Sequence, residues 1–375
     1  MVKGARLVLP MLALAGGCAA IAGLDRDYRE GNASGPGEGG GPGEGGGSST
    51  GGGSGCEIAQ PPGPPMIGTG EGPDFLTAFR QIALGENESG IQFGYDLDGV
   101  CTDMSGVPAS CAPPPLGKTP EDGPGGIDNS ADGVFTALSN MAGSPLTSGA
   151  ITEQAKQGFW SVLLRVRGYS GQPDDDQVEL AVYTTPGIRA LGGVPAWMGT
   201  DEWPVFRSAL ADQATLDTPA IFDPQAYVSG GVLVGRIARM PLQLRSAIYS
   251  LTVTLSQVVI SATVEPAEGG YRLKDGTLAG SWGLPDIFQG LSEFRLFGQP
   301  ICTDHDEYTS IKPAFCDRVD MRVEGGAPEA PCEAVSFGLR FLAEPALLYV
   351  DPFDDEMVTP ACEPTLDPMF DTCDE

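Results

Sequence analysis

Basic side chains are scarce in this sequence, which has 21 Lys and Arg against 50 Asp and Glu and a formal net charge of −29. So negative a chain repels nucleic-acid phosphates and has few cations with which to displace their counterions. We therefore expect no nucleic-acid partner. Charged residues make up only 19% of the chain and hydrophobic residues 41%, and this much apolar material can form a core, which excludes disorder of the whole chain.

Histidine is nearly absent, because His305 is the only imidazole, and no two cysteines have the Cys-x-x-Cys spacing. The sequence therefore has too few suitable ligands for a tetrahedral zinc site of Cys and His. Ser-His or Cys-His catalysis would have to use His305, which stands between Asp304 and Asp306. We interpret it as a surface residue, so the sequence nominates no catalytic residue.

Long apolar runs are also absent after the N-terminus. The one at the start, Leu7–Ala15, follows the cationic residues Lys3 and Arg6 and is followed by Gly-Gly-Cys. These are the three regions of a secretory signal peptide, and a run of about ten residues is too short to cross a bilayer, which takes ~20. One interpretation of this segment is therefore a plain secretory signal peptide, after which the cysteine is a coincidence.

The segment Leu14–Cys18, Leu-Ala-Gly-Gly-Cys, resembles the lipobox of bacterial lipoproteins, although Leu is the usual residue at the place of Ala15. The resemblance implies that residues 1–17 are a signal peptide and that Cys18 carries the lipid, which makes the membrane a partner through the anchor. The residue after the lipid-bearing cysteine is Ala19 and not Asp. By the same resemblance, this implies that the protein is anchored in the outer membrane of the cell envelope, on its periplasmic side or at the surface.

Residues 18–55 are expected to form the lipid-anchored Cys and a disordered linker. Residues 31–55 contain 14 glycines and no apolar side chain larger than Ala33, so they cannot bury a core. A Gly-rich coil of this length reaches roughly 25–30 Å. Residues 56–375 then form a single disulfide-rich body.

The body is predicted to be mainly β, an antiparallel β-sandwich or jelly-roll-like fold with a few short helices and disulfide-bridged loops. Its strand candidates show a period of two, and Gly, Pro and Asp loops separate them without regular alternation of strand and helix. An Asp-Gly pair at 275–276 predicts a hairpin turn. The expected strands are Trp160–Arg167, Val178–Thr184, Val232–Met240, Leu251–Val264 and Tyr271–Trp282, and the expected helices are Asp132–Met141 and Asp286–Phe297.

With Cys18 lipidated, eight cysteines remain in an exported body, which predicts four disulfides. Short loops close easily, so we expect Cys101 with Cys111, Cys302 with Cys316 and Cys362 with Cys373, and by elimination Cys56 with Cys332.

Clustered Asp, Asn and Gly residues predict a calcium site formed by Asp96, Asp98, Asp128 and Asn129. Calcium takes six to eight oxygen ligands, which acidic and amide side chains and tight glycine turns provide. The run from Gly126 to Gly133 also resembles part of the Asp/Asn-rich calcium repeats of extracellular proteins. The alternative is that these side chains cap turns of their own backbone and bind no metal.

Two tryptophans and two acids suggest a binding surface for sugars in the segment 195–204. Exposed Trp197 and Trp203 would stack on pyranose rings, while Asp201 and Glu202 would accept hydrogen bonds from hydroxyls. The alternative is that both rings form a hydrophobic lid. We thus expect a membrane-tethered lipoprotein that acts as a surface binding or structural module, with carbohydrate or an envelope protein as partner. An exported hydrolase of polysaccharide is the second hypothesis.

Overall fold

The computed structural model describes residues 58–66, 72–85, 93–102, 109–113, 121–140, 146–212, 215–245, 247–323, 328–355 and 361–373. The chain divides into the units Met1–Gly51 and Gly52–Glu375, and all described residues belong to the second. The predicted signal peptide, Cys18, the linker and Cys56 lie outside the described residues. Within the described ranges, no helix combines the length and the apolar character needed to span a bilayer.

The described chain forms eleven strands, four α-helices and three short 3-10 helices. The strands are β1 (Phe75–Ala83), β2 (Val162–Arg167), β3 (Asp175–Thr184), β4 (Glu202–Trp203), β5 (Ile221–Ser229), β6 (Val232–Arg245), β7 (Tyr249–Ala267), β8 (Gly270–Gly283), β9 (Arg295–Leu296), β10 (Gln299–Pro300) and β11 (Ala334–Leu348). The helices are α1 (Ala131–Ser139), α2 (Ser148–Lys156), α3 (Leu284–Glu293), α4 (Asp306–Cys316), η1 (Ile188–Leu191), η2 (Arg207–Ala209) and η3 (Pro368–Phe370).

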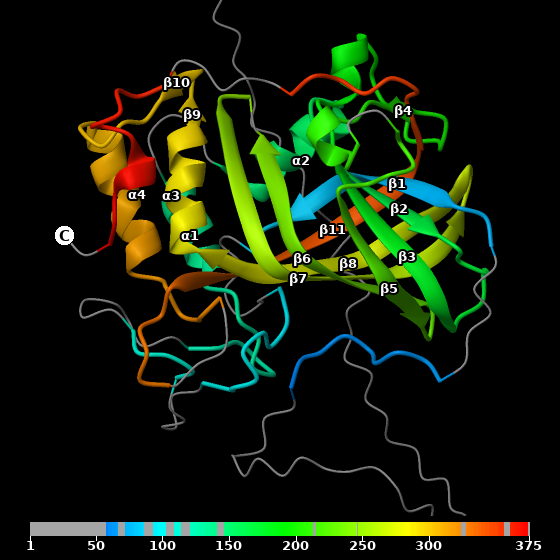
Figure 1. The fold of residues 1–375 in the computed structure, drawn as a ribbon, viewed down its shortest axis with the longest axis horizontal. Helices are drawn as coiled ribbons and strands as arrows, with labels where there is room; N and C mark the ends of the chain where they lie inside the picture. Colours follow the sequence, from blue (N-terminus) through cyan, green and yellow to red (C-terminus); the bar gives the residue numbers. More distant parts are fainter. Residues whose placement is uncertain are drawn as a thin grey trace, which may run out of the picture. The chain divides into compact units, whose positions relative to one another are not determined.

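Eight strands form one sheet that closes on itself (Figure 1). Each pairs antiparallel with the next in the order β7, β6, β5, β3, β2, β1, β11 and β8, and β8 pairs with β7 again. β9 and β10 extend the sheet beside β7, and β4 pairs in parallel with the end of β11. The predicted mainly β body is confirmed, and opposite walls of this closed ring enclose the core as the two layers of a sandwich do.

Successive side chains of a strand point into and out of the ring, and those that point inward are apolar. In β2, Val162, Leu164 and Val166 belong to the main core, while Arg165 and Arg167 occupy the opposite face. All five expected strands are present with slightly different ends. Their period of two arises because one face is buried in the ring.

The predicted hairpin turn at Asp275-Gly276 is wrong. Strand β8 continues through both residues, and its turn from β7 lies at residues 268–269. Asp275 has a φ of 51° at an irregularity of the β7–β8 register, so the pair forms a bulge. A Cβ at Gly276 would lie 2.4 Å from the ring of Phe341, which stacks on Phe79 with centroids 4.2 Å apart. The glycine therefore makes room for an aromatic pair of the core.

A second apolar cluster covers the outer face of β1, β2 and β3. Leu76, Leu163 and Tyr183 of these strands pack against Trp203 and Val205 of the segment 188–210. This segment thus has a core of its own, and β1, β2 and β3 each carry buried apolar side chains on both faces over part of their length.

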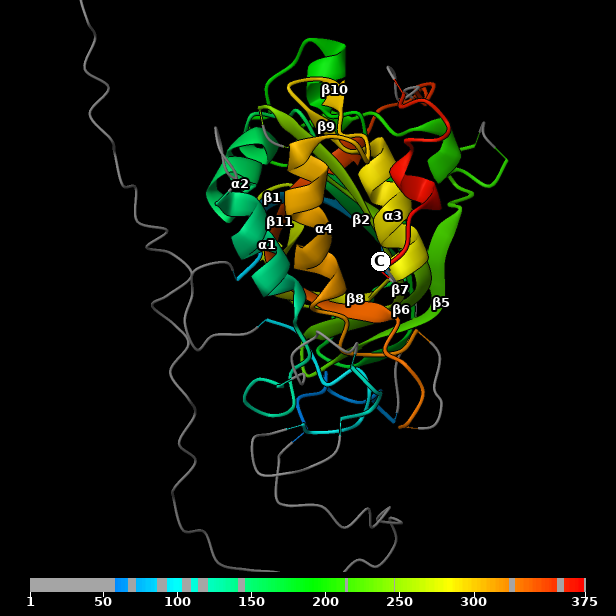
Figure 2. The same cartoon turned by 90° about the vertical axis from the view of Figure 1, so that its left-hand side faces the viewer.

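Helices α1, α4 and α3 lie side by side at one end of the ring, as Figure 2 shows. Phe135, Phe288 and Phe315, one from each helix, belong to the main core. Helix α2 packs against β1, where the Thr152 hydroxyl donates to the Ile82 carbonyl at 2.9 Å. The expected helices correspond to α1 and α3, while α2 and α4 were not predicted.

The predicted disulfide pairing is wrong. The structure joins Cys111 to Cys332, Cys302 to Cys362 and Cys316 to Cys373, and Cys101 is also disulfide-bonded. The partners are separated by 221, 60 and 57 residues along the chain. Short loops did not decide the pairing. The C-terminal segment packs against α3 and bonds to α4, which brings Cys362 and Cys373 to Cys302 and Cys316. Backbone pairing of Ala112 with Pro331 brings Cys111 to Cys332.

Candidate functional site

The structure brings three of the four predicted calcium ligands together. Asp96, Asp98 and Asp128 each offer a carboxylate oxygen, and these oxygens all lie within 4.8 Å of one another. We call these three residues the acidic cluster. Two segments meet there, since the Asp128 amide donates to the Tyr95 carbonyl at 3.0 Å. Asp96 and Asp128 are each only 3% exposed.

Local turns position the acidic cluster. Asp96 Oδ1 accepts a hydrogen bond from the Gly99 amide at 2.7 Å, and Asp128 Oδ2 accepts one from the Leu97 amide at 2.6 Å. Gly99 has a φ of 78°, a left-handed conformation that glycine adopts without a steric penalty. Asp96 thus caps its own turn, as the alternative predicts, whereas Asp128 bonds to the other segment and so helps to bring the carboxylates together.

Burial governs the electrostatics of this region. Burial, together with the charge of Asp98, raises the pKa of Asp128 to about 9. Burial also raises the pKa of Asp96, and that of the neighbouring Asp122 to about 6. Such acids need a proton or a cation to be stable inside the protein.

Asn129 does not join the acidic cluster, so this part of the calcium prediction is wrong. Its amide group instead bonds to the backbone of β11: Nδ2 donates to the Gly338 carbonyl at 3.2 Å, and Oδ1 accepts from the Gly338 amide at 3.1 Å. Nδ2 also donates to the Phe93 carbonyl at 2.9 Å. Asn129 thus holds the segment 93–102 against the closed ring.

We expect Gly338→Ala to destabilise the protein by about 3 kcal/mol, because overpacking next to rigid backbone is costly. A Cβ at this position would lie 1.7 Å from the carbonyl oxygen of Phe93, so the loop would have to move away. The measurement is urea unfolding. Gly149→Ala is the control, since Gly149 is exposed in helix α2 with its nearest neighbour atom 3.9 Å from the added Cβ. That change should stabilise by up to about 1 kcal/mol. Equal stability of the two variants would contradict the close approach of Phe93 to β11.

The sugar platform predicted at the two tryptophans is not formed. Trp203 is fully buried in the second apolar cluster, and Trp197 packs on it with ring centroids 5.5 Å apart. Asp201 accepts hydrogen bonds from the amides of Ala196 and Trp197, at 2.8 and 2.7 Å, so it caps its own loop. Glu202 is exposed on β4. The lid alternative is correct, because the outer face of β1, β2 and β3 needs apolar cover.

His305 is placed as a surface residue, with 44% of its side chain exposed. Cys302, Asp304 and His305 lie close enough to form a metal-binding group. The Cys302 sulfur, however, is bonded to Cys362, so it offers no thiolate.

A large cleft, which the sequence did not reveal, opens beside β6. Pairing between β5 and β6 is limited to Val232–Val234, so the rest of β6 has no strand neighbour on that side within the described chain. The cleft has a volume of about 1110 Å³. Its lining comes mainly from α2, η2, the ends of β3, β6 and α3, the start of β7, and β9, and we call it the polar cleft. The lining includes Gln154, Gln157, Phe159, Thr184, Phe206, Ser208, Gln243, Arg245, Tyr249, Ser250, Thr252, Glu293, Arg295, Phe297 and Asp355.

Arg295 is the most deeply buried cation of the polar cleft, at 8% exposure. Its Nη1 donates to the carbonyls of Ser292 and Phe294, both at 2.8 Å. Its Nε is buried and has no hydrogen-bond partner among the described residues. Burial lowers the pKa of this guanidinium. The Arg295 guanidinium is therefore fixed in the cleft wall by two backbone carbonyls, with its Nε buried.

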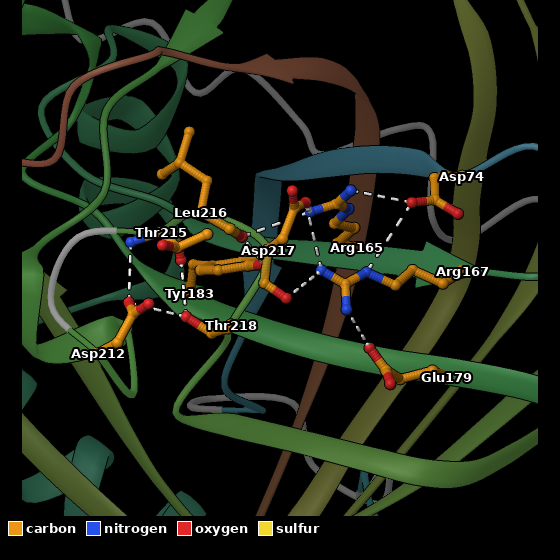
Figure 3. A network of polar contacts seen from close by, with 10 residues as sticks. All are labelled: Asp74, Arg165, Arg167, Glu179, Tyr183, Asp212, Thr215, Leu216, Asp217 and Thr218. Atoms are coloured by element: carbon orange, nitrogen blue, oxygen red, sulfur yellow. Dashed lines mark hydrogen bonds and ion pairs between the residues drawn. The ribbon is translucent and has the colours of Figure 1, made fainter.

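An arginine network on the outer face of β2 joins this strand to neighbouring segments (Figure 3). Arg165 donates to Asp74 and to Asp217, both at 2.9 Å, and Arg167 donates to Glu179 at 2.7 Å. Both arginines are thus paired with acids, and through Asp217 they hold the segment 215–218 on the sheet. Partly exposed pairs of this kind each contribute about 0–1 kcal/mol to stability.

Comparison of the chain with protein-family models, with curated proteins and with solved structures finds no match. Its function must therefore be argued from the site itself, and the described residues offer two places for it, the acidic cluster and the polar cleft.

Proposed function

We propose that the chain is a lipid-anchored protein of the bacterial cell envelope whose body binds a neutral carbohydrate in the polar cleft. The lipobox-like segment that ends at Cys18 supports the anchor. The observation that carries the binding function is the cleft itself, which combines planar amides, hydroxyls and aromatic rings.

The polar groups of the cleft suit a ligand rich in hydroxyls. Gln154, Gln157 and Gln243 present amides, each of which both donates and accepts hydrogen bonds. Ser250 and Thr252 add hydroxyls from β7. A sugar hydroxyl also donates and accepts, so these side chains can match several hydroxyls in succession.

The charges of the cleft favour a neutral ligand. Arg245 and Arg295 are balanced by Glu293 and Asp355, so the lining carries no net charge although the chain carries −29. A site for a strong anion would need an excess of cations, and a site for a cation would need an excess of acids.

Two aromatic rings at the cleft can stack on sugar rings. Phe297 is 63% exposed and Phe159 is 40% exposed, and one face of Phe159 is covered by the guanidinium of Arg189 at 5.1 Å. An exposed ring gains from covering an apolar pyranose face. The proposed sugar-binding surface thus lies in the cleft and not at the two tryptophans.

The hydrolase hypothesis keeps one supporting observation. Glu293 and Asp355 both line the cleft, and a pair of carboxylates flanking a glycosidic bond is the requirement of most glycosidases. Asp355 is exposed and accepts hydrogen bonds from the Ser208 amide and hydroxyl. Release of reducing ends from a bound glycan over time would support this second function.

The test is binding of the detergent-solubilised full-length protein to an array of neutral and charged glycans. We expect binding to neutral glycans, with affinity reduced roughly 5- to 30-fold in Gln243→Ala and in Phe297→Ala, since each removes a cleft contact worth about 1–2 kcal/mol. Phe222→Ala is the matched control, because Phe222 is 46% exposed on β5 and does not line the cleft. Binding to anionic glycans alone, or equal binding by all variants, would contradict the proposal.

A further inference from the structure

We propose that the acidic cluster binds one Ca²⁺ ion, with Asp96, Asp98 and Asp128 as ligands. This inference is independent of the carbohydrate proposal, because the cluster and the polar cleft share no residue.

The separation of the oxygens fits calcium. Ca²⁺ binds oxygen at 2.3–2.6 Å, so two ligands on opposite sides of the ion lie at most about 5 Å apart. The three carboxylate oxygens, all within 4.8 Å of one another, satisfy this limit. Mg²⁺ demands near-ideal octahedral geometry and gives up its water reluctantly, so a site of three protein carboxylates suits it less well than Ca²⁺.

The hydrogen bonding of the Asp96 carboxylate is not explained by clustering of acids alone. Its Oδ1 accepts from the Gly99 amide, but its Oδ2 is buried and has no hydrogen-bond partner among the described residues. A buried carboxylate oxygen without a donor is unfavourable unless a cation satisfies it. Calcium at the cluster would supply that partner.

Among the described residues, no basic side chain forms an ion pair with Asp96. A cavity of about 150 Å³ beside it is also lined by Arg236, yet within the described chain this guanidinium forms no ion pair with Asp96. Gln60, Tyr95 and Gln257 line the same cavity. It is polar and has room for several water molecules, which can complete the six to eight oxygens of a calcium shell.

The ion would link two segments that are far apart in the sequence. Asp96 and Asp98 belong to residues 93–102, while Asp128 directly precedes Asn129, whose amide holds Phe93 and Gly338 together. Calcium would therefore fix this loop pair to β11, and its removal should loosen the pair.

The first measurement is thermal unfolding of the full-length protein in EDTA, Ca²⁺ or Mg²⁺ at matched ionic strength. With a Kd near ~10⁻⁴ M, 10 mM Ca²⁺ should raise the Tm by roughly 4 °C. Mg²⁺ should raise it much less. Titration calorimetry on the EDTA-treated protein should give one Ca²⁺ per chain.

Asp96→Asn separates the proposal from generic charge screening. In this variant the amide oxygen can still accept from the Gly99 amide, and the NH₂ group takes the place of Oδ2. Because Oδ2 accepts no hydrogen bond among the described residues, the substitution removes none. In EDTA we expect its Tm to equal or exceed that of the wild type, because repulsion with Asp98 and Asp128 falls. In Ca²⁺ we expect the Tm shift to disappear.

Asp223→Asn is the matched control, since Asp223 is a buried acid of β5 that bonds to backbone amides and is not part of the acidic cluster. Its two oxygens accept from the amides of Gln225 and Arg236, at 2.9 and 2.7 Å. The control should lower the Tm in EDTA and keep the full Ca²⁺ shift. Equal shifts with Ca²⁺ and Mg²⁺, or a Ca²⁺ shift that persists in Asp96→Asn, would overturn the proposal.

Discussion

Replacing Cys111 and Cys332 together with alanine should lower the free energy of unfolding by about 5 kcal/mol. The bond closes a loop of 221 residues, and the entropy that a cross-link removes from the unfolded chain grows with the length of that loop. Urea unfolding measures the change. For a body of this size we expect the Tm to fall by roughly 7 °C.

The control is the shorter bridge between Cys316 and Cys373, which spans 57 residues. Its removal should destabilise by about 4 kcal/mol on the same entropy argument. Peptide mapping without reduction should find Cys111 linked to Cys332 and not to Cys101. A free thiol at Cys111, or a double variant as stable as the wild type, would refute the pairing and its energetic role.

Cys18→Ser should release the protein from the membrane fraction. The proposed anchor is a pair of acyl chains on the Cys18 sulfur, and two chains hold a protein stably because each buried CH₂ contributes about 0.8 kcal/mol. Serine offers no thiol for this acylation. Fractionation of cells into soluble and membrane pools, followed by immunoblotting, gives the result.

Ala19→Ser is the control for this experiment, because it changes the next residue and leaves the thiol in place. It should remain with the membrane. If Cys18→Ser also stays membrane-bound, the lipid anchor is not what holds the protein there.

Five strands could be predicted from the sequence because each has one covered and one open face over part of its length. The first and last strands of the ring, β1 and β11, could not. Both are buried on nearly all positions, as at Phe79 and Phe341 within the ring and Leu76 and Ala346 on its outer face. A strand that is covered on both sides loses the alternation by which it is recognised.

The two candidate sites, the acidic cluster and the polar cleft, also differ in how far they could be predicted from the sequence. Asp96 and Asp98 could be predicted to meet because a short glycine turn places them together, and Asp128 lies in a second turn of the same composition. The polar cleft could not be predicted, since Gln157, Gln243 and Arg295 come from elements distant in sequence. The position of a turn can be inferred locally, whereas a cleft depends on the whole arrangement of strands.

Closure of the ring has a consequence for the proposed export of the chain. Strand β1 begins at Phe75, but its neighbour β11 begins only at Ala334. A polypeptide that crosses a membrane with its N-terminus first therefore cannot complete its core until nearly all of it has emerged. Pairing across so long a separation is also slow. Translocation should thus finish before folding, and during that interval the abundant carboxylates oppose aggregation of the emerging chain through mutual repulsion.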